Sequence, residues 1–286
     1  SIMKLLPKTA KIKSGKILVN GADITGYTEK NMSRLRGELF SMVFQDPMTS
    51  LNPTITVGKQ IGEAVRIHNK KMSRGQIRKR VIELMQLVEI DRPEERIRQY
   101  PHEFSGGMRQ RAVMAIALAG DPKILFADEP TTALDVTIQA QILDVFRRIQ
   151  KKMEMATVFI SHDLGVVAGV ADRVAVMYAG KIVEIGTAEE IFYDPRHPYT
   201  WGLLQSLPIL AGEKEWLPTL PGMPPTLIHP PKGDAFAERN VYAMRIDYEK
   251  EPPMFQVTDT HYAATWLLDE RAPKVKVPME GRRYGK

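Results

Sequence analysis

The stretch Lys123-Ile-Leu-Phe-Ala-Asp-Glu-Pro130 decides the fold, because it is a short apolar run that ends in two carboxylates. A second apolar run, Thr157–Ile160, follows a segment of helical character from about residue 136 to 152. Short continuous apolar strands that alternate with helices indicate a parallel sheet covered on both faces, hence an α/β fold. Asp128 and Glu129 then lie at the carboxyl end of a strand, where ligands of open α/β sheets bind.

The rest of the chain divides by pattern. Strands are predicted near Gly15–Ile24, which includes a tight turn, and in Leu39–Phe44, Arg173–Met177 and Ile182–Ile185. Helices are predicted between Thr56 and Val88 and in Met108–Ala119. Prolines become frequent after Asp194, so residues 195–286 are interpreted as an appended, loop-rich extension.

Composition bounds the possible functions of the chain. The 286 residues are 43% hydrophobic, which is enough for a sizeable core. The longest apolar run is the octet Ala112–Ala119, too short to cross a bilayer, so any membrane association is expected to come from a partner. The net charge of +6 is a weak signal for nucleic acid. With no cysteine, thiolate metal sites and disulfides are excluded.

The two carboxylates suggest phosphate chemistry. An apolar strand that closes on Asp is the Walker B pattern, in which Asp128 would hold Mg²⁺, usually through water, while the ion bridges phosphate oxygens. Glu129 would orient and polarise the attacking water as general base. Taken alone, the pair is equally compatible with a capping or salt-bridging role.

A second motif is Phe104-Ser-Gly-Gly-Met-Arg-Gln-Arg111, in which Ser105, Gly106 and Gly107 open a helix. Glycines let the backbone approach a phosphate, and a helix N-terminus presents unpaired N–H groups. Taken alone, the motif also fits an ordinary N-cap followed by a flexible turn.

The order and spacing of five such elements resemble the ABC ATPase family from about residue 11 to 194. Each match rests on residue type and position, namely Gln45 for the Q-loop, Ser105-Gly106-Gly107 for the signature, Asp128-Glu129 for Walker B, Asp135 for the D-loop and His162 for the switch histidine. The resemblance implies a P-loop NTPase-like (RecA-like) core with a mainly parallel sheet. It also implies a helical signature subdomain at about 55–104 that grips a permease.

The resemblance also implies roles for these residues. Two such domains would face each other head to tail, so that each signature contacts the ATP held by the other domain. Gln45 would contact Mg²⁺ or water and sense the membrane partner, His162 would hydrogen-bond the γ-phosphate, and Asp135 would cross the interface. Glu129 and His162 are therefore the expected catalytic residues.

Further stretches of the sequence resemble the ATP-binding subunits of oligopeptide and dipeptide importers. There are four such stretches, Phe44–Pro53, Asp128–Leu143, Arg196–Leu204 and Gly233–Met244. We therefore expect an ATPase domain at 1–194 and an importer-type extension at 195–286. The expected partners are a second ATPase subunit, in a heterodimer, two transmembrane permease subunits and an extracellular or periplasmic peptide-binding protein, with no nucleic acid. The expected location is peripheral, on the cytoplasmic face of the cell membrane.

Two departures from the family pattern are visible. Many relatives carry cysteines near the end that bind an iron–sulfur cluster, whereas Asp234, Asn240 and their neighbours stand here, so no cluster is expected. No P-loop pattern G-x-x-x-x-G-K-[ST] occurs either. We interpret the second departure as N-terminal truncation, with Ser1–Pro7 as the end of the helix after that loop, and expect the 286-residue chain alone to lack ATPase activity.

Alternative functions remain open at this point. A degenerate subunit that does not hydrolyse ATP, and lends its signature to a partner's nucleotide, fits the missing loop. Soluble ABC-type ATPases that act on nucleic acid share the five core elements, although the sequence has no long coiled-coil insertion. The sequence also leaves open the peptide length, and whether nickel or sugars are carried instead.

Overall fold

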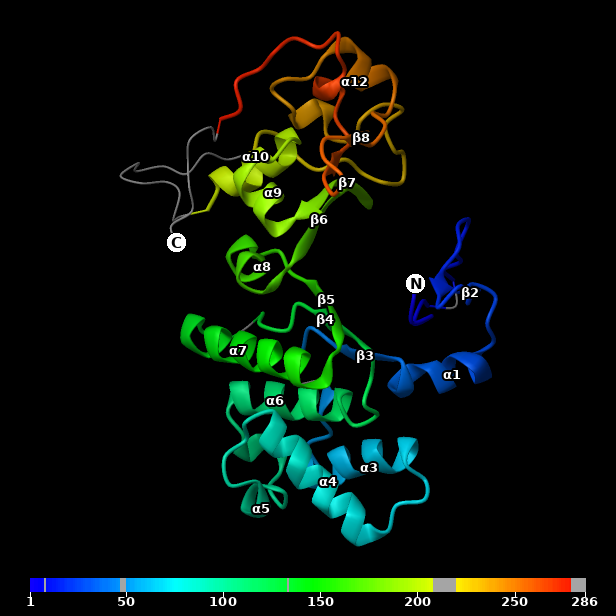
Figure 1. The fold of residues 1–286 in the computed structure, drawn as a ribbon, viewed down its shortest axis with the longest axis vertical. Coiled ribbons are helices and arrows are strands. Elements are labelled where there is room, and N and C mark those ends of the chain that lie inside the picture. The colour runs from blue at the N-terminus through cyan, green and yellow to red at the C-terminus, as the bar shows by residue number, and fades with distance from the viewer. Residues whose placement is uncertain (8, 47–49, 133, 208–219, 279–286) are drawn as a thin grey trace. The chain divides into compact units, whose positions relative to one another are not determined.

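The computed structural model describes residues 1–7, 9–46, 50–132, 134–207 and 220–278 (Figure 1). Its contacts divide the chain into two compact units, Ser1–His162 and Asp163–Lys286. No helix among the described residues is both long enough and apolar enough to span a bilayer.

The first unit is built on a parallel three-stranded sheet in the order β3-β4-β5. The strands are β3 (Phe40–Val43), β4 (Ile124–Asp128) and β5 (Ala156–Ile160). Met42 is opposite Phe126, and Phe126 is opposite Val158. The three predicted strands and their parallel pairing are therefore confirmed.

Helices cover one face of this sheet. They are α6 (Gly106–Ala117) and α7 (Val136–Met153), with α3 (Val57–His68), α4 (Arg74–Leu87), α5 (Pro93–Arg96) and the short 3₁₀ helix η1 (Pro101–Glu103) beyond them. Figure 1 shows α6 between α7 and the α3–α4 pair, and one apolar core joins them to Leu125. The predicted helical region is thus two helices, because Ser73 starts α4 with a capping box.

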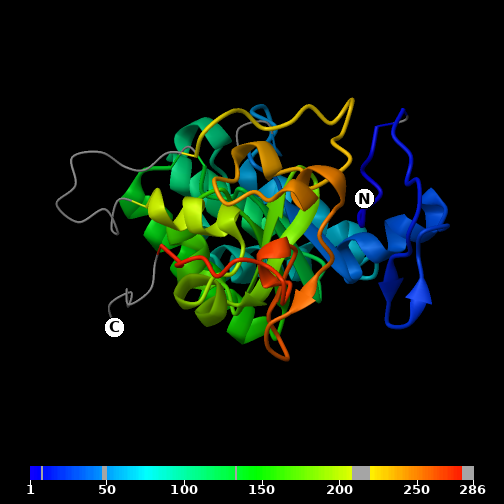
Figure 2. The same cartoon turned by 90° about the horizontal axis from the view of Figure 1, so that it is seen from above.

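A hairpin and a helix precede the sheet, and the helix α1 (Glu29–Glu38) packs beside β3. The hairpin consists of β1 (Leu18–Val19) and β2 (Ala22–Asp23), and α1 follows it (Figure 2). Asn20 and Gly21 both have positive φ, which is typical of a two-residue hairpin turn. Ile24 and α1 residues form a small core with Phe40 and Phe126.

The expectation of a helix end in Ser1–Pro7 is wrong. These described residues form a turn, in which the amide of Lys4 donates to the carbonyl of Ser1 at 2.9 Å. Lys4 also has a φ of 51°, which a right-handed helix does not allow.

The second unit contains an antiparallel sheet in the order β6-β7-β9-β8. Its elements are α8 (Leu164–Val170), β6 (Arg173–Tyr178), β7 (Lys181–Thr187), α9 (Ala188–Tyr193), α10 (Pro198–Gln205), η2 (Ala237–Arg239), α12 (Arg245–Glu249), β8 (Phe255–Gln256), β9 (Tyr262–Ala263) and η3 (Trp266–Leu268). The run at 173–178 thus pairs with its hairpin neighbour β7 instead of extending the parallel sheet. The boundary near residue 194 stays a proposal, and residues on both sides of it share this sheet.

Candidate functional site

Glu129 occupies the turn directly after the central strand β4. Its φ is 44°, in the left-handed region that non-glycine residues rarely adopt. Its amide donates to the carbonyl of Ile160 at 2.9 Å, which continues the pairing of β4 with β5. Pro130 has no N–H and cannot extend the strand. A strained residue of this kind at the end of a buried strand is typical of a functional position.

Three side chains hold the Glu129 carboxylate. Gln45 donates from Nε2 to Oε2 at 2.8 Å, and Thr132 donates from Oγ1 to the same oxygen at 2.9 Å. His162 Nδ1 lies 3.0 Å from Oε1. Gln45, Glu129 and His162, predicted separately from the sequence, are therefore brought together at one edge of the sheet.

Thr132 is the member of this cluster that sequence reasoning missed. Its usable signal is its position, three residues after Glu129 in a turn, where a hydroxyl can reach back to a carboxylate. We name the four residues Gln45, Glu129, Thr132 and His162 the carboxylate cluster.

The carboxylate cluster keeps Glu129 ionised. The hydrogen bonds from His162, Thr132 and Gln45 hold the pKa of the Glu129 carboxyl below its usual value. The Glu129 side chain is 24% exposed and that of His162 is 71% exposed. A charged carboxylate at the surface, next to a partly open imidazole, can polarise a water and accept its proton.

Asp128 ends β4 and is half-buried. In the described residues no group of three or more His, Asp or Glu side chains forms a metal site. Mg²⁺ commonly binds through one or two carboxylates and completes its shell with water and substrate phosphates. The oxygen donors of Asp128 and Gln45 therefore fit a magnesium site that a nucleotide would complete.

The predicted signature residues lie at the start of α6. Ser105 is the N-cap, and its Oγ accepts a hydrogen bond from the Met108 amide at 3.3 Å. A Cβ on the buried Gly107 would be 2.7 Å from Ile138 Cγ2, so this glycine permits close contact between α6 and α7. Ser105 and Gly106 are exposed at the helix N-terminus, where an anion could be bound.

Asp135 is the N-cap of α7. Its Oδ1 accepts a hydrogen bond from the Ile138 amide at 2.9 Å. Because the side chain of Ile138 also lies against Gly107, the signature and the predicted D-loop are linked through one residue. Neither Ser105 nor Asp135 has a hydrogen bond to Glu129 among the described residues, so the structure does not place them in the carboxylate cluster.

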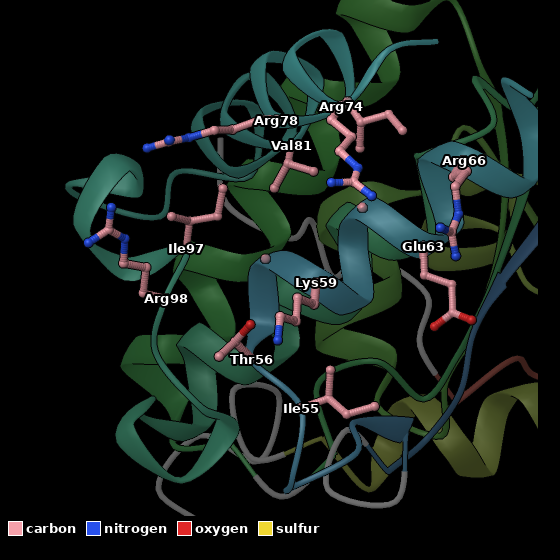
Figure 3. A pocket seen from close by; sticks show the side chains of 13 residues that line it. Ile55, Thr56, Lys59, Glu63, Arg66, Arg74, Arg78, Val81, Ile97 and Arg98 are labelled. Carbon is pink, nitrogen blue, oxygen red and sulfur yellow. The ribbon is translucent and has the colours of Figure 1, made fainter. Parts of the chain in front are cut away.

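A groove of about 620 Å³ lies along α3 and α4 (Figure 3). Its apolar lining includes Ile55 and Ile97, and its rim carries Lys59, Arg74 and Arg78. The wall is fixed because the amide of Gly58 donates to the Ile97 carbonyl at 3.2 Å, with no room for a Cβ there. This groove, which we name the helical groove, offers an apolar floor and a cationic rim.

Comparisons with known proteins identify the family of this chain. Residues 1–132 match the family model described as ABC transporter, and residues 183–246 match the one described as Oligopeptide/dipeptide transporter, C-terminal region. The chain is 61% identical over 281 residues to the oligopeptide transport ATP-binding protein OppD of Bacillus subtilis (strain 168), covering 97% of this chain and 78% of that protein.

Two further relatives extend the comparison. The dipeptide transport ATP-binding protein DppD of Lactococcus lactis subsp. cremoris (strain MG1363) is 58% identical over 275 residues, covering 96% of this chain and 79% of that protein. Among solved structures, cbiO1 from Clostridium perfringens, described as part of the ABC transporter complex cbiONQ, has a TM-score of 0.59 at 28% identity, covering 68% of this chain and 72% of that one. Sequence identity at this level over nearly the whole chain, together with a shared fold, means that the chain belongs to the ABC transporter family of ATP-binding proteins, in the group with the oligopeptide/dipeptide transporter C-terminal region.

Proposed function

We propose that this chain belongs to the ATPase subunit of an ABC importer, in which ATP hydrolysis with Mg²⁺ energises the import of oligopeptides or dipeptides through a membrane permease. The observation that carries the proposal is the carboxylate cluster, in which Glu129 is ionised and held by groups from three separate segments. The relatives named for oligopeptide and dipeptide transport support the substrate class.

Each side chain of the cluster has a role in the proposed reaction. Glu129 accepts a proton from the attacking water, and His162 orients Glu129 and reaches toward the terminal phosphate. Asp128 and Gln45 would hold Mg²⁺, which supplies charge neutralisation on the phosphate oxygens. Oε2 of Glu129 accepts two hydrogen bonds, whereas Oε1 accepts one and keeps a lone pair that a water can use.

The assembly partners are part of the proposal. A second ATPase subunit, different from this one, would present its signature to the nucleotide, while Ser105, Gly106 and Asp135 of this chain would act in the reciprocal site. Two permease subunits and an extracellular or periplasmic peptide-binding protein complete the importer. The chain would then lie on the cytoplasmic face of the membrane as a peripheral subunit.

The proposed reaction is tested by Glu129→Gln in the assembled transporter that carries this subunit. We expect ATP turnover to fall by about 10² to 10⁴-fold, the usual contribution of a general base, while nucleotide binding persists. Glu94→Gln, on an exposed residue of α5, is the matched control and should leave turnover unchanged. Unchanged turnover in Glu129→Gln would contradict the assignment.

The helical groove is the proposed docking site for the permease. Its apolar floor would take an amphipathic cytoplasmic segment of the partner, and its cations would pair with acidic groups. We expect the double variant Arg74→Glu with Arg78→Glu to lower permease copurification at least about tenfold, since like charges across an interface are costly. Lys79→Glu, exposed on the same helix but outside the groove, is the control. Equal effects of the two changes would exclude the groove.

A further inference from the structure

A second concave surface of the first unit lies between α1 and the connection of α3 to α4. Its volume is about 950 Å³. Two of its cations, Lys30 and Arg34, come from α1, and two, Lys70 and Lys71, come from the connection. Among the described residues that line it, Glu38 is the only acid. We name this surface the basic recess.

The four cations of the basic recess are not neutralised by neighbours. None of them makes an ion pair with the described part of the chain. Nearby cations do make such pairs, since Arg36 pairs with Glu29, and Arg80 lies 2.6 Å from Asp121. The recess thus has an excess of positive charge facing solvent.

The two walls of the recess are held in fixed contact. Gly37, with a φ of 94°, lies so close to His68 that an added Cβ would be 1.9 Å from Cε1 of the imidazole. A Cβ on Gly120 would be 2.2 Å from the Gly37 carbonyl oxygen. The end of α1 therefore rests on the end of α3, and cations from both elements converge on one concavity.

An exposed aliphatic side chain borders these cations. Ile67 lines the recess and is 59% exposed, three residues before Lys70. An aliphatic group beside clustered lysines is the combination that binds the interface of an anionic membrane.

We propose that the basic recess binds the phosphate headgroup of an anionic phospholipid in the membrane leaflet that faces this subunit. The inference rests on the proposed function, since that function brings the chain to a membrane. Lys30, Arg34, Lys70 and Lys71 contact the phosphate, and Ile67 enters the headgroup layer. Each of these cations strengthens partitioning about fivefold.

The test is co-sedimentation of the purified chain with vesicles. Vesicles of phosphatidylcholine mixed with phosphatidylglycerol should bind the wild type, and binding should fall with salt, while phosphatidylcholine alone should bind weakly. Lys70→Gln with Lys71→Gln should weaken binding about 25-fold. The matched control is Lys151→Gln with Lys152→Gln, an exposed lysine pair at the end of α7 with the same change in net charge.

Several results would overturn the proposal. One is equal binding of the wild type to both vesicle types, and another is an equal loss of vesicle binding in the two double variants. A third is a recess variant that still binds vesicles as the wild type does but no longer binds inorganic phosphate or duplex DNA. Ile67→Ser gives a second check, because it should weaken vesicle binding without changing the charge. ATP turnover and peptide uptake are measured separately, so failure of the lipid site leaves the proposed transport function standing.

Discussion

Burial of His197 predicts a pH-dependent loss of stability in the second unit. The residue is fully buried at the N-cap of α10, where its Nδ1 accepts a hydrogen bond from the Tyr199 amide at 3.0 Å. Its ring lies 5.8 Å from that of Phe236. This burial lowers the pKa of His197 to about 3 from a usual value of 6.5, because the charged form would lose its hydration.

The sign and size of this change in the free energy of unfolding follow from proton linkage. Above pH 6.5 the His197 imidazole is neutral in the folded and in the unfolded chain, so the free energy of unfolding is not reduced by this residue. Below pH 6.5 the unfolded chain binds a proton that the folded chain refuses, so the free energy of unfolding falls by about 1.4 kcal/mol per pH unit. The loss amounts to about 5 kcal/mol by pH 3. Asp234 acts in the opposite direction, since burial raises its pKa to about 6.

The assay compares urea unfolding of the wild type and His197→Asn over this pH range. Asn retains an acceptor for the Tyr199 amide but does not titrate. All three tryptophans of the sequence lie between residues 163 and 286, so their fluorescence reports on the second unit. The comparison cancels Asp234, which both proteins contain.

The His197→Asn variant should be less stable than the wild type at neutral pH. The difference between their free energies of unfolding should narrow by about 1.4 kcal/mol per pH unit below pH 6.5. Parallel stability curves between pH 6.5 and 4 would refute this reasoning.

Two further predictions concern the first unit. Thr132→Val removes one donor to Glu129 and should lower ATP turnover of the assembled transporter about tenfold, in line with ~1.5 kcal/mol for a hydrogen bond to a charged group. Thr132→Ser should restore most of it. Gly107→Ala should destabilise the first unit by about 1–3 kcal/mol, because the methyl group would overlap Ile138. The destabilisation by Gly107→Ala should be smaller in a protein that already carries Ile138→Ala, and a double-mutant cycle of unfolding free energies measures this. If the effects of the two substitutions simply add, the contact between Gly107 and Ile138 is not the cause.

The strands of the first unit were predictable because each is a continuous apolar run buried in a parallel sheet. Leu125 and Ala127 of β4 are fully buried, and this burial is what their composition indicates. The N-terminal seven residues were mispredicted from the family resemblance alone. In the structure the Lys4 amide donates to the carbonyl of Ser1 in a turn, and its ammonium group donates to the carbonyl of Tyr27 at 2.6 Å.

The second unit was less predictable because its key contacts are distant in sequence. Glu184 of β7 is fully buried, and it lies 2.8 Å from His261 Nε2, 77 residues away. The amide of His197 donates to the same carboxylate at 3.1 Å. Nothing in the local pattern around either partner marks this pairing, because it depends on β9 returning to lie beside β7.

The carboxylate cluster was predictable for a topological reason. Gln45, Glu129 and His162 each follow a parallel strand within two residues, and the order β3-β4-β5 places Glu129 on the central strand between the other two. Any residues in these positions must meet at the carboxyl edge of the sheet. Ser105 and Asp135 instead precede helices, and each uses its side chain as a cap. Sheet topology does not bring them to this carboxylate, and in the proposed dimer they would act instead at the nucleotide of the facing subunit.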